Sequence, residues 1–167
     1  MKKMTEKSLS EAFAGESMAH MKYLIFAEVA EESGNPKLAR LFRAIAYAEF
    51  VHAKNHARNL GYIGDNVENL KAAMEGENFE VTEMYPAYMA IAQLQEETGA
   101  QRSIRYAEEA EKIHYAMYGA ALKNAENGKD ADADEVYVCP VCGYTHIGIP
   151  PDKCPVCGAD SSKFAKF

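Results

Sequence analysis

The sequence lacks any apolar run long enough to cross a bilayer, which takes about 20 residues. It also lacks an excess of positive charge, because the 167-residue chain has a formal net charge of −7. This acidity argues against a general affinity for nucleic acid or an anionic membrane surface. Residues 1–7 turn polar where a secretory signal would need an apolar stretch. We therefore expect a cytoplasmic protein with no nucleic-acid or membrane partner.

Proline is nearly missing from residues 5–127, where it occurs only at positions 36 and 86. The same stretch is rich in Ala, Glu, Leu, Met and Lys, which favour helices. A longer connection is expected over 61–78, with a helical turn or two near 66–75. Four long helices with one long central crossover are typical of a ferritin-like bundle. The helices are predicted at about 5–32, 36–60, 79–97 and 99–126.

Cysteine is missing before position 139. Residues 127–135 are polar, acidic and poor in large apolar side chains, which is typical of a linker. The segment that follows is too short to fold on a hydrophobic core alone. We predict a helical domain at 1–133 and a small cysteine domain at 134–167.

The helical region contains the motif Glu-x-x-His twice, as Glu49 with His52 and as Glu111 with His114. Three-residue spacing puts each pair on one helix face, and small or apolar residues precede both pairs. A charge on such a face is costly unless it is paired or bound to a metal. One such motif arises easily by chance in a Glu-rich helix. Two of them, in the second and fourth helices, indicate a metal site.

The first and third helices offer further carboxylates. Glu16 precedes Glu49 by nearly the same distance as Glu80 precedes Glu111. Glu83 lies one turn beyond Glu80 and has no counterpart in the first half. A glutamate from two helices together with Glu-x-x-His from two others is the pattern of di-iron and di-manganese carboxylate proteins. Two cations would neutralise most of the charge of five converging carboxylates, which would otherwise repel one another.

Carboxylates with two imidazoles suit iron or manganese, although imidazole also accepts zinc. Any single glutamate in so acidic a chain is better explained as a solvated surface residue, and the recurring spacing is what favours a metal site. His20, one turn after Glu16, is interpreted as a structural neighbour of the site, and His56, one turn after His52, is left out. Tyr23, on the face of Glu16, is the tyrosine expected beside the metals.

The cysteines form two copies of the knuckle Cys-Pro-Val-Cys-Gly, in which the glycine lets the backbone turn so that amides point at the sulfurs. Four thiolates take zinc, which would be structural, or a single iron, which would be redox-active. Tyr144 and Phe164 could help to form a dry shell, which favours iron. Thiolate ligands suit a reducing compartment, and the spacing argues against disulfides. The predicted ligands are Cys139, Cys142, Cys154 and Cys157.

Several segments together carry a resemblance to a known family. They are AGES at 14–17, AEFVHAK at 48–54, EVTEMYP at 80–86, AEKIH at 110–114 and the two CPVCG knuckles. In these segments the chain resembles the rubrerythrins over nearly its whole length, with no departure at a ligand position.

The resemblance implies an all-α ferritin-like four-helix bundle with a di-iron site, followed by a small rubredoxin-like four-cysteine iron domain, in a homodimer. It implies that the carboxylates of Glu49 and Glu111 bridge the irons and that Glu83 exchanges with His52 as one iron changes oxidation state. It also implies NADH-linked peroxidase activity, with electrons arriving through the rubredoxin-like site of the partner subunit. The implied iron ligands are Glu16, Glu49, His52, Glu80, Glu83, Glu111 and His114.

The resulting hypothesis is reduction of hydrogen peroxide to water, in protection against oxidative stress. The sequence has no Gly-rich dinucleotide fingerprint, so NAD(P)H would be oxidised by a separate rubredoxin-type reductase, or a rubredoxin would donate the electrons. The main alternative is a ferritin-like iron oxidation and storage protein with a structural zinc tail. An electron carrier with a structural bundle, or reduction of oxygen or nitric oxide at the same centre, also remains open.

Overall fold

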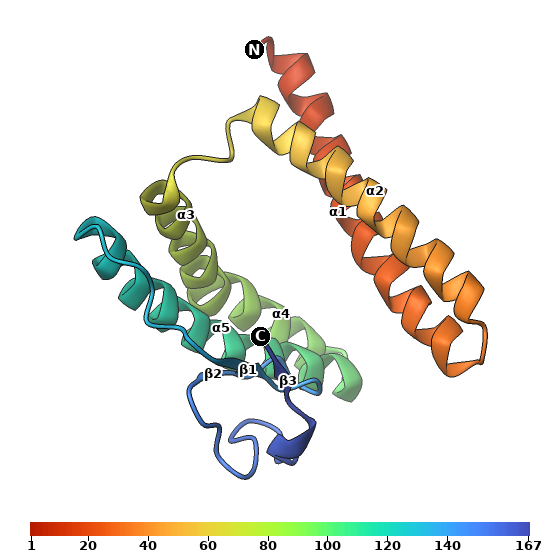
Figure 1. Ribbon diagram of the computed structural model, residues 1–167, viewed down its shortest axis with the longest axis vertical. Coiled ribbons are helices and arrows are strands. Elements are labelled where there is room, and N and C mark those ends of the chain that lie inside the picture. Colours follow the sequence, from red (N-terminus) through yellow and green to blue (C-terminus); the bar gives the residue numbers. More distant parts are fainter. The chain divides into compact units, whose positions relative to one another are not determined.

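Helices make up most of the computed structural model, which describes all residues from 1 to 167 (Figure 1). None of these helices combines the length and apolar character that a membrane span requires. The chain divides into two units, Met1–Gly64 and Asp65–Phe167, and each is described by itself.

The first unit is a pair of helices, α1 (Lys3–Glu32) and α2 (Pro36–Leu60), that lie side by side (Figure 1). A left-handed Gly34 and the proline at the start of α2 make the short turn between them. A left-handed Gly61 ends α2 by donating its amide to the last helical carbonyls. The predicted bounds of these two helices are therefore confirmed to within two residues.

Alanine fills the contact between α1 and α2. The side chains of Ala39 and Ala46 on α2 are fully buried, and Ala27 on α1 is 1% exposed. Such small residues let the two backbones approach closely. His20 adds a polar tie across the pair, because its Nδ1–H donates to the Ala46 carbonyl at 2.8 Å. This contact fits the structural role expected for His20.

The second unit begins with one long helical run made of α3 (Asn66–Phe79), a π-helical segment (Glu80–Met84) and α4 (Tyr85–Leu94). The helix predicted at 79–97 therefore begins much earlier, and the long crossover predicted over 61–78 is wrong. The cause is a capping box, in which the Glu68 amide donates to the Asp65 carboxylate and the Asp65 amide donates to the Glu68 carboxylate, both at 2.9 Å.

The π-helical segment has a local cause in the sequence. Pro86 comes two residues after its end, in the first turn of α4. Proline has no N–H to donate to the carbonyl four residues earlier, and its ring crowds that carbonyl. A wider turn relieves the crowding, and the Tyr85 amide donates instead to the carbonyl of Glu80. The run then turns into α5 (Thr98–Glu126).

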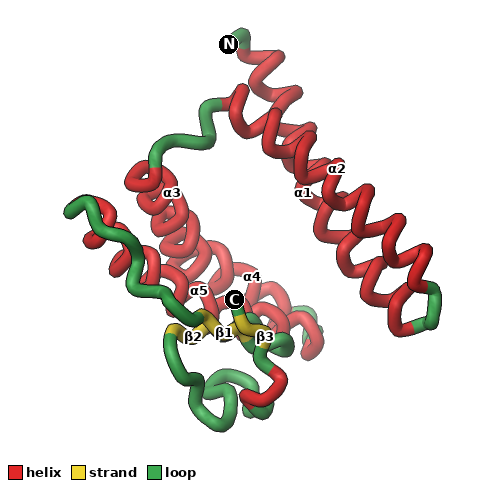
Figure 2. Tube along the Cα trace, in the orientation of Figure 1, coloured by secondary structure: helices red, strands yellow, loops and turns green.

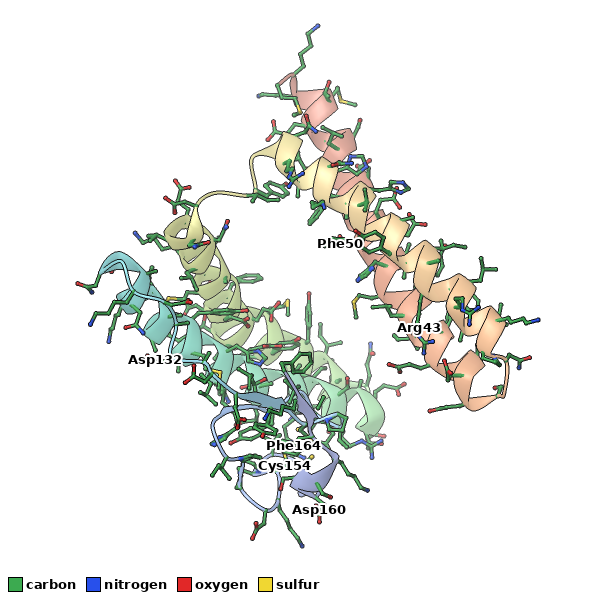
Figure 3. All side chains as sticks on the ribbon, in the orientation of Figure 1. Arg43, Phe50, Asp132, Cys154, Asp160 and Phe164 are labelled. Carbon is green, nitrogen blue, oxygen red and sulfur yellow. The ribbon has the colours of Figure 1, made fainter.

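The C-terminal part is a small three-stranded antiparallel sheet with the order β2-β1-β3, shown as strands in Figure 2. Its strands are β1 (Val136–Val138), β2 (Thr145–Ile147) and β3 (Ala165–Lys166), with a 3₁₀ turn at Ser161–Lys163. Its core is built on the cysteines and Tyr144, with Phe164 packed against them (Figure 3). The fold class is thus confirmed: four long helical segments are followed by a small four-cysteine region.

Candidate metal centres

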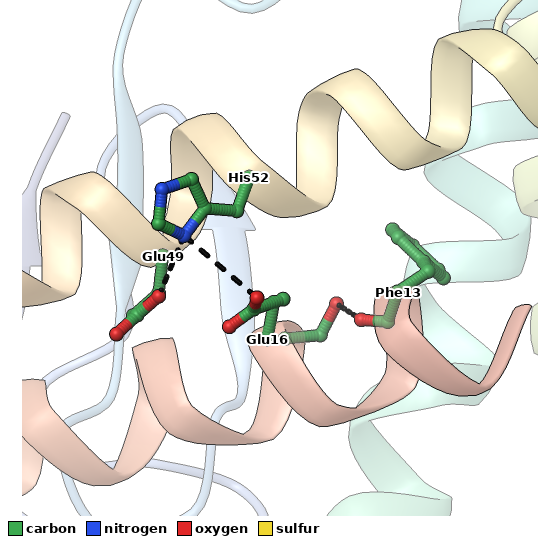
Figure 4. A network of polar contacts seen from close by, with 5 residues as sticks. Phe13, Glu16, Glu49 and His52 are labelled. Atoms are coloured by element: carbon green, nitrogen blue, oxygen red, sulfur yellow. Dashed lines mark hydrogen bonds and ion pairs between the residues drawn. The ribbon is translucent and has the colours of Figure 1, made fainter. Parts of the chain in front are cut away.

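The first Glu-x-x-His motif lies with Glu16 on the α1–α2 pair (Figure 4). His52 Nδ1 is 2.9 Å from Glu49 Oε2 and 3.7 Å from Glu16 Oε1. The ligand atoms of the three residues all lie within 4.8 Å of one another, which is close enough for one ion to reach them together. We call these residues the first triad. The His52 side chain is 53% exposed, so this triad is open on one side.

Tyr23 lies in an aromatic group of the same helix pair. Its ring centroid is 6.2 Å from that of Phe26 and 6.3 Å from that of Phe42. The structure therefore gives Tyr23 a packing role in this aromatic group. Its expected place beside the metals stays a prediction.

The second Glu-x-x-His motif forms a similar cluster on α3 and α5, in the second unit. Glu77, Glu111 and His114 bring their ligand atoms within 4.8 Å of one another. His114 Nδ1 is 2.5 Å from Glu111 Oε2, and the His114 side chain is 27% exposed. We call these residues the second triad. Glu77 was not among the predicted ligands.

Carboxylates crowd the second triad. Burial, a hydrogen bond to Glu111 and the charges of Glu111 and Glu80 raise the pKa of Glu77 to about 7. Burial and the charge of Glu111 also raise the pKa of Glu80, with His114 partly opposing them. Glu80 therefore lies beside the triad, whereas Glu83 is exposed and not part of it. Tyr85 is the nearby tyrosine, because burial and the charges of these carboxylates raise its pKa.

One signal in the sequence could have identified Glu77. Glu77, Glu80 and Glu83 follow one another at three-residue spacing, so they form a stripe along one helix. The predicted helix started at residue 79 and left Glu77 outside it. Recognition of the capping box at Asp65 would have placed Glu77 on the helix with the other two.

Both triads suit a metal cation by the chemistry of their donors. Each offers two carboxylates and one imidazole, a set that binds iron or manganese and also accepts zinc. Burial first, and then the charge of Glu111, raise the pKa values of Glu77 and Glu80. A bound cation would relieve this repulsion. Five of the seven predicted di-iron ligands thus lie in these two clusters, and a sixth, Glu80, lies beside the second, whereas Glu83 does not join them.

The four cysteines form the third centre, and all four are free thiols. Cys139 Sγ is 3.6 Å from Cys157 Sγ, and Cys142 Sγ is 3.4 Å from Cys154 Sγ. These distances are too long for disulfides. They are near the roughly 3.8 Å edge of a tetrahedron with metal–sulfur bonds of about 2.3 Å. The cysteines therefore fit a single tetrahedral metal ion.

Backbone amides point at these sulfurs, as expected for the two knuckles. Burial raises the pKa of Cys142 above its ordinary range, although the Tyr144 amide donates to the sulfur and opposes the rise. Burial also disfavours the thiolate of Cys154, but hydrogen bonds from the amides of Cys157 and Val156 and from the neighbouring thiols outweigh it and lower that pKa to about 7. Amides aimed at sulfur stabilise a thiolate and the metal it holds.

Comparison with known proteins gives the same picture. A family model described as rubrerythrin matches residues 7–122, and one described as the rubredoxin-like domain of rubrerythrin matches residues 137–165. Rubrerythrin-2 of Clostridium acetobutylicum is 43% identical over 178 residues, covering 98% of this chain and 97% of the relative. Nigerythrin of Nitratidesulfovibrio vulgaris is 34% identical, covering 98% of this chain and 86% of the relative.

Solved structures of nigerythrin are similar to this chain as well. A mixed-valence state superposes with a TM-score of 0.56, and a fully reduced, all-ferrous state with a TM-score of 0.58. Both are 32% identical in sequence and cover 98% of this chain and 86% of theirs. With both triads and the cysteine centre in place, these matches show that the chain belongs to the rubrerythrin family.

Proposed function

We propose that the chain reduces hydrogen peroxide to water at a di-iron site, with electrons relayed through the four-cysteine iron from an NAD(P)H-dependent reductase. Its family is an oxidoreductase family of generally peroxide-reducing di-iron proteins, which supports this reaction class. The observation that carries the proposal is the combination of two Glu–Glu–His triads with a tetrathiolate centre in one chain.

Reduction of one peroxide molecule to two waters takes two electrons and two protons. When bound, the di-iron pair would supply two electrons, one from each iron, and the cysteine-bound iron would replace them one at a time. Burial and the charges of Glu80 and Glu111 raise the pKa of Tyr85 above its ordinary value, so its hydroxyl stays protonated well above neutral pH. It therefore offers a hydrogen-bond donor near the carboxylates of the second triad.

The ligand assignment and domain division belong to the proposal. The irons would be held by Glu and His residues of a helical domain at 1–133, and the third iron by the cysteines of a domain at 134–167. Glu77 is added as a further carboxylate close enough to contribute. Besides Glu77, the proposed ligands of the di-iron pair are Glu16, Glu49, His52, Glu80, Glu83, Glu111 and His114.

We also propose a homodimer in the cytoplasm, served by a rubredoxin or a rubredoxin-type reductase. Apolar side chains on the first helix pair support the dimer, because Ile25, Val29 and Leu41 are each more than half exposed, at 53%, 57% and 55%. Large apolar side chains with this exposure are available for a contact with another protein surface.

The test is to reduce the iron-loaded chain without oxygen and mix it with stoichiometric peroxide or with oxygen. The colour of the ferric tetrathiolate and the absorption of the di-iron pair are followed together. Faster reoxidation of both centres by peroxide than by oxygen is the expected result. Faster reaction with oxygen, with ferric mineral accumulating, would replace the proposal with iron storage.

A further inference from the structure

The two cysteine knuckles share one sequence but differ in their access to solvent. The first cysteine of each is buried, Cys139 at 1% exposed and Cys154 at 3%. The second cysteine of the first knuckle, Cys142, is buried as well. The matching residue of the second knuckle, Cys157, is half-buried. The sulfur of Cys157 is therefore the ligand atom that another molecule can approach most closely.

Helix α5 covers the first knuckle where the second is open. Gly143 follows Cys142, and a Cβ added to it would lie 3.8 Å from the methyl group of Ala110 on α5. Gly158 follows Cys157 in the same way and has a similar left-handed backbone, with φ of 77°. A Cβ added to Gly158 would meet no atom within 4 Å. The surface beside Cys157 is thus free for a contact with another protein.

The residues around Cys157 are small and uncharged. Pro155 is exposed, whereas Val156 and Ala159 are half-buried and pack against the cysteine core. An apolar centre with a polar rim is the usual composition of a protein–protein contact. Electron transfer weakens steeply with distance, so small residues beside a sulfur ligand favour transfer from a docked donor.

Charge is distributed unevenly along the chain. Residues 136–167 hold three of the 18 basic residues and two of the 25 acidic residues. The cysteine region therefore has a formal charge of +1, whereas residues 1–135 carry a formal charge of −8. An acidic protein would be repelled by the helical region and not by the cysteine region.

Two lysines place positive charge at the second knuckle. Lys153 directly precedes Cys154, and Lys163 lies in the 3₁₀ turn that follows the knuckle. Both lysines are exposed. The backbone of Asp160 joins them, because it pairs with Lys153 in an antiparallel bridge and its carbonyl accepts from the Lys163 amide at 3.2 Å. The third lysine of the region, Lys166, is held in an ion pair.

We propose that the second knuckle, with Cys157 at its centre and Lys153 and Lys163 at its rim, is the docking surface for a small acidic one-electron carrier protein of the rubredoxin type. This rests on the proposed function, which requires an external donor. The charge difference between the two regions steers the carrier to the knuckle. One electron then passes: the carrier's iron is oxidised from ferrous to ferric, the cysteine-bound iron is reduced from ferric to ferrous, and no bond breaks.

The test reverses the charge of the rim in the iron-loaded full chain, without oxygen or peroxide. NADH, a rubredoxin reductase and a trace of an acidic rubredoxin reduce the chain, and bleaching of its ferric tetrathiolate is followed. Lys153→Glu with Lys163→Glu should slow bleaching about 10-fold at low salt, and added salt should narrow the difference. Lys3→Glu with Lys37→Glu, an equal charge change at exposed sites of the first unit, should stay within about twofold of the wild type.

A second readout is binding of zinc-loaded rubredoxin, measured by calorimetry, which should weaken about 10-fold in the rim variant and stay unchanged in the control. Reduction by photoreduced lumiflavin, which is uncharged, should be equal in all three proteins. If the rim variant loses iron, Lys153→Gln with Lys163→Gln replaces it, with about a threefold effect expected. Wild-type bleaching and binding in a loaded rim variant, or an equal loss in the control, would overturn the proposal. Failure of peroxide reduction would overturn only the proposed function.

Discussion

His52 and His114 occupy the same place in two copies of one motif, yet their surroundings differ. His52 is 53% exposed, and its contacts are made through Nδ1, to Glu49 and Glu16. His114 is 27% exposed and is bonded at both ring nitrogens, to Glu111 and to Thr145. The two imidazoles therefore differ in how freely they can rotate, because the packing around each motif decides how firmly its histidine is held.

This difference bears on the exchange that family resemblance implies, in which Glu83 takes the place of His52. A ring tied at one nitrogen can rotate away by breaking the bonds of that nitrogen alone. A ring tied at both must also give up its contact with a neighbouring strand. The imidazole of the first triad is therefore held less firmly than the imidazole of the second.

The largest expected effect comes from removing each imidazole in turn. A partner that orients a ligand is worth about 10–100-fold in metal affinity, so loss of His114 together with its Thr145 bond should exceed that range. His114→Ala should lower ferrous-ion affinity more than about 100-fold, and His52→Ala about 10-fold. Titration of ferrous ion against a competing chelator measures both, with His56→Ala, outside either triad, as the control. Equal losses for His52 and His114 would remove the asymmetry described above.

Two buried alanines allow the helix pairs to be compared by overpacking. Ala46 is 0% exposed in the α1–α2 contact, and Ala110 is 2% exposed beneath the Gly143 knuckle. Leucine at either position should lower the free energy of unfolding by about 1–3 kcal/mol, measured by chemical denaturation. Only Ala110→Leu should also change the spectrum of the iron tetrathiolate. The same spectral change with Ala46→Leu would contradict the separate roles of the two contacts.

A smaller effect is expected at the helix starts. Asp65→Ala removes the capping box of α3 and should cost about 1 kcal/mol of stability, measured by thermal unfolding. Asn35, at the start of α2, makes no side-chain cap, so Asn35→Ala is the matched control with little loss. Asp65→Asn should restore most of the stability, since asparagine also caps well. An equal loss at both starts would show that the capping box is not what begins α3.

The smallest effect concerns the extra carboxylate of the second triad. The pKa of Glu77 is raised from 4.5 to about 7 in the folded chain. The folded state therefore favours the protonated form, and this contribution to stability is complete below pH 4.5 and is lost as the pH rises through about 7. Solvent screening keeps the effect on the metal-free chain below about 1 kcal/mol.

Glu77→Gln should flatten the pH dependence of unfolding between these two values, measured by denaturation at a series of pH values. The exposed Glu75→Gln, on the same helix, is the control and should leave the slope unchanged. A slope that persists in the Gln variant at position 77 would assign it to another group.

The sequence indicated most of the elements that hold the centres. Pro36 and Gly61 mark the bounds of α2, and the cysteine spacing indicates the tetrathiolate centre. Each of these signals comes from residues that lie close together in the chain. The start of α3 lies inside the segment predicted as a crossover, although its signal, the capping box of Asp65 and Glu68, is local in the sequence. Glu77 was missed as a consequence.

Other features depend on contacts between distant segments. The His114–Thr145 hydrogen bond requires the cysteine region to pack on α5, and no pattern of spacing predicts that. Tyr23 shares a helix face with Glu16, but a shared face does not decide whether a ring packs on a metal ligand or on Phe26. Such placements follow from tertiary packing, which a single sequence does not reveal.

The buried alanines of α2 have a further consequence for the shape of its contact with α1. Ala39, Ala46 and Ala53 recur at a strict seven-residue interval. A heptad repeat stays against its partner only when the two helices wind around each other with a left-handed supercoil. If these alanines are the a positions of the heptad, Glu49 falls on a d position, which coiled coils usually fill with leucine. The carboxylate proposed to bind metal thus stands where an apolar residue would strengthen the pair.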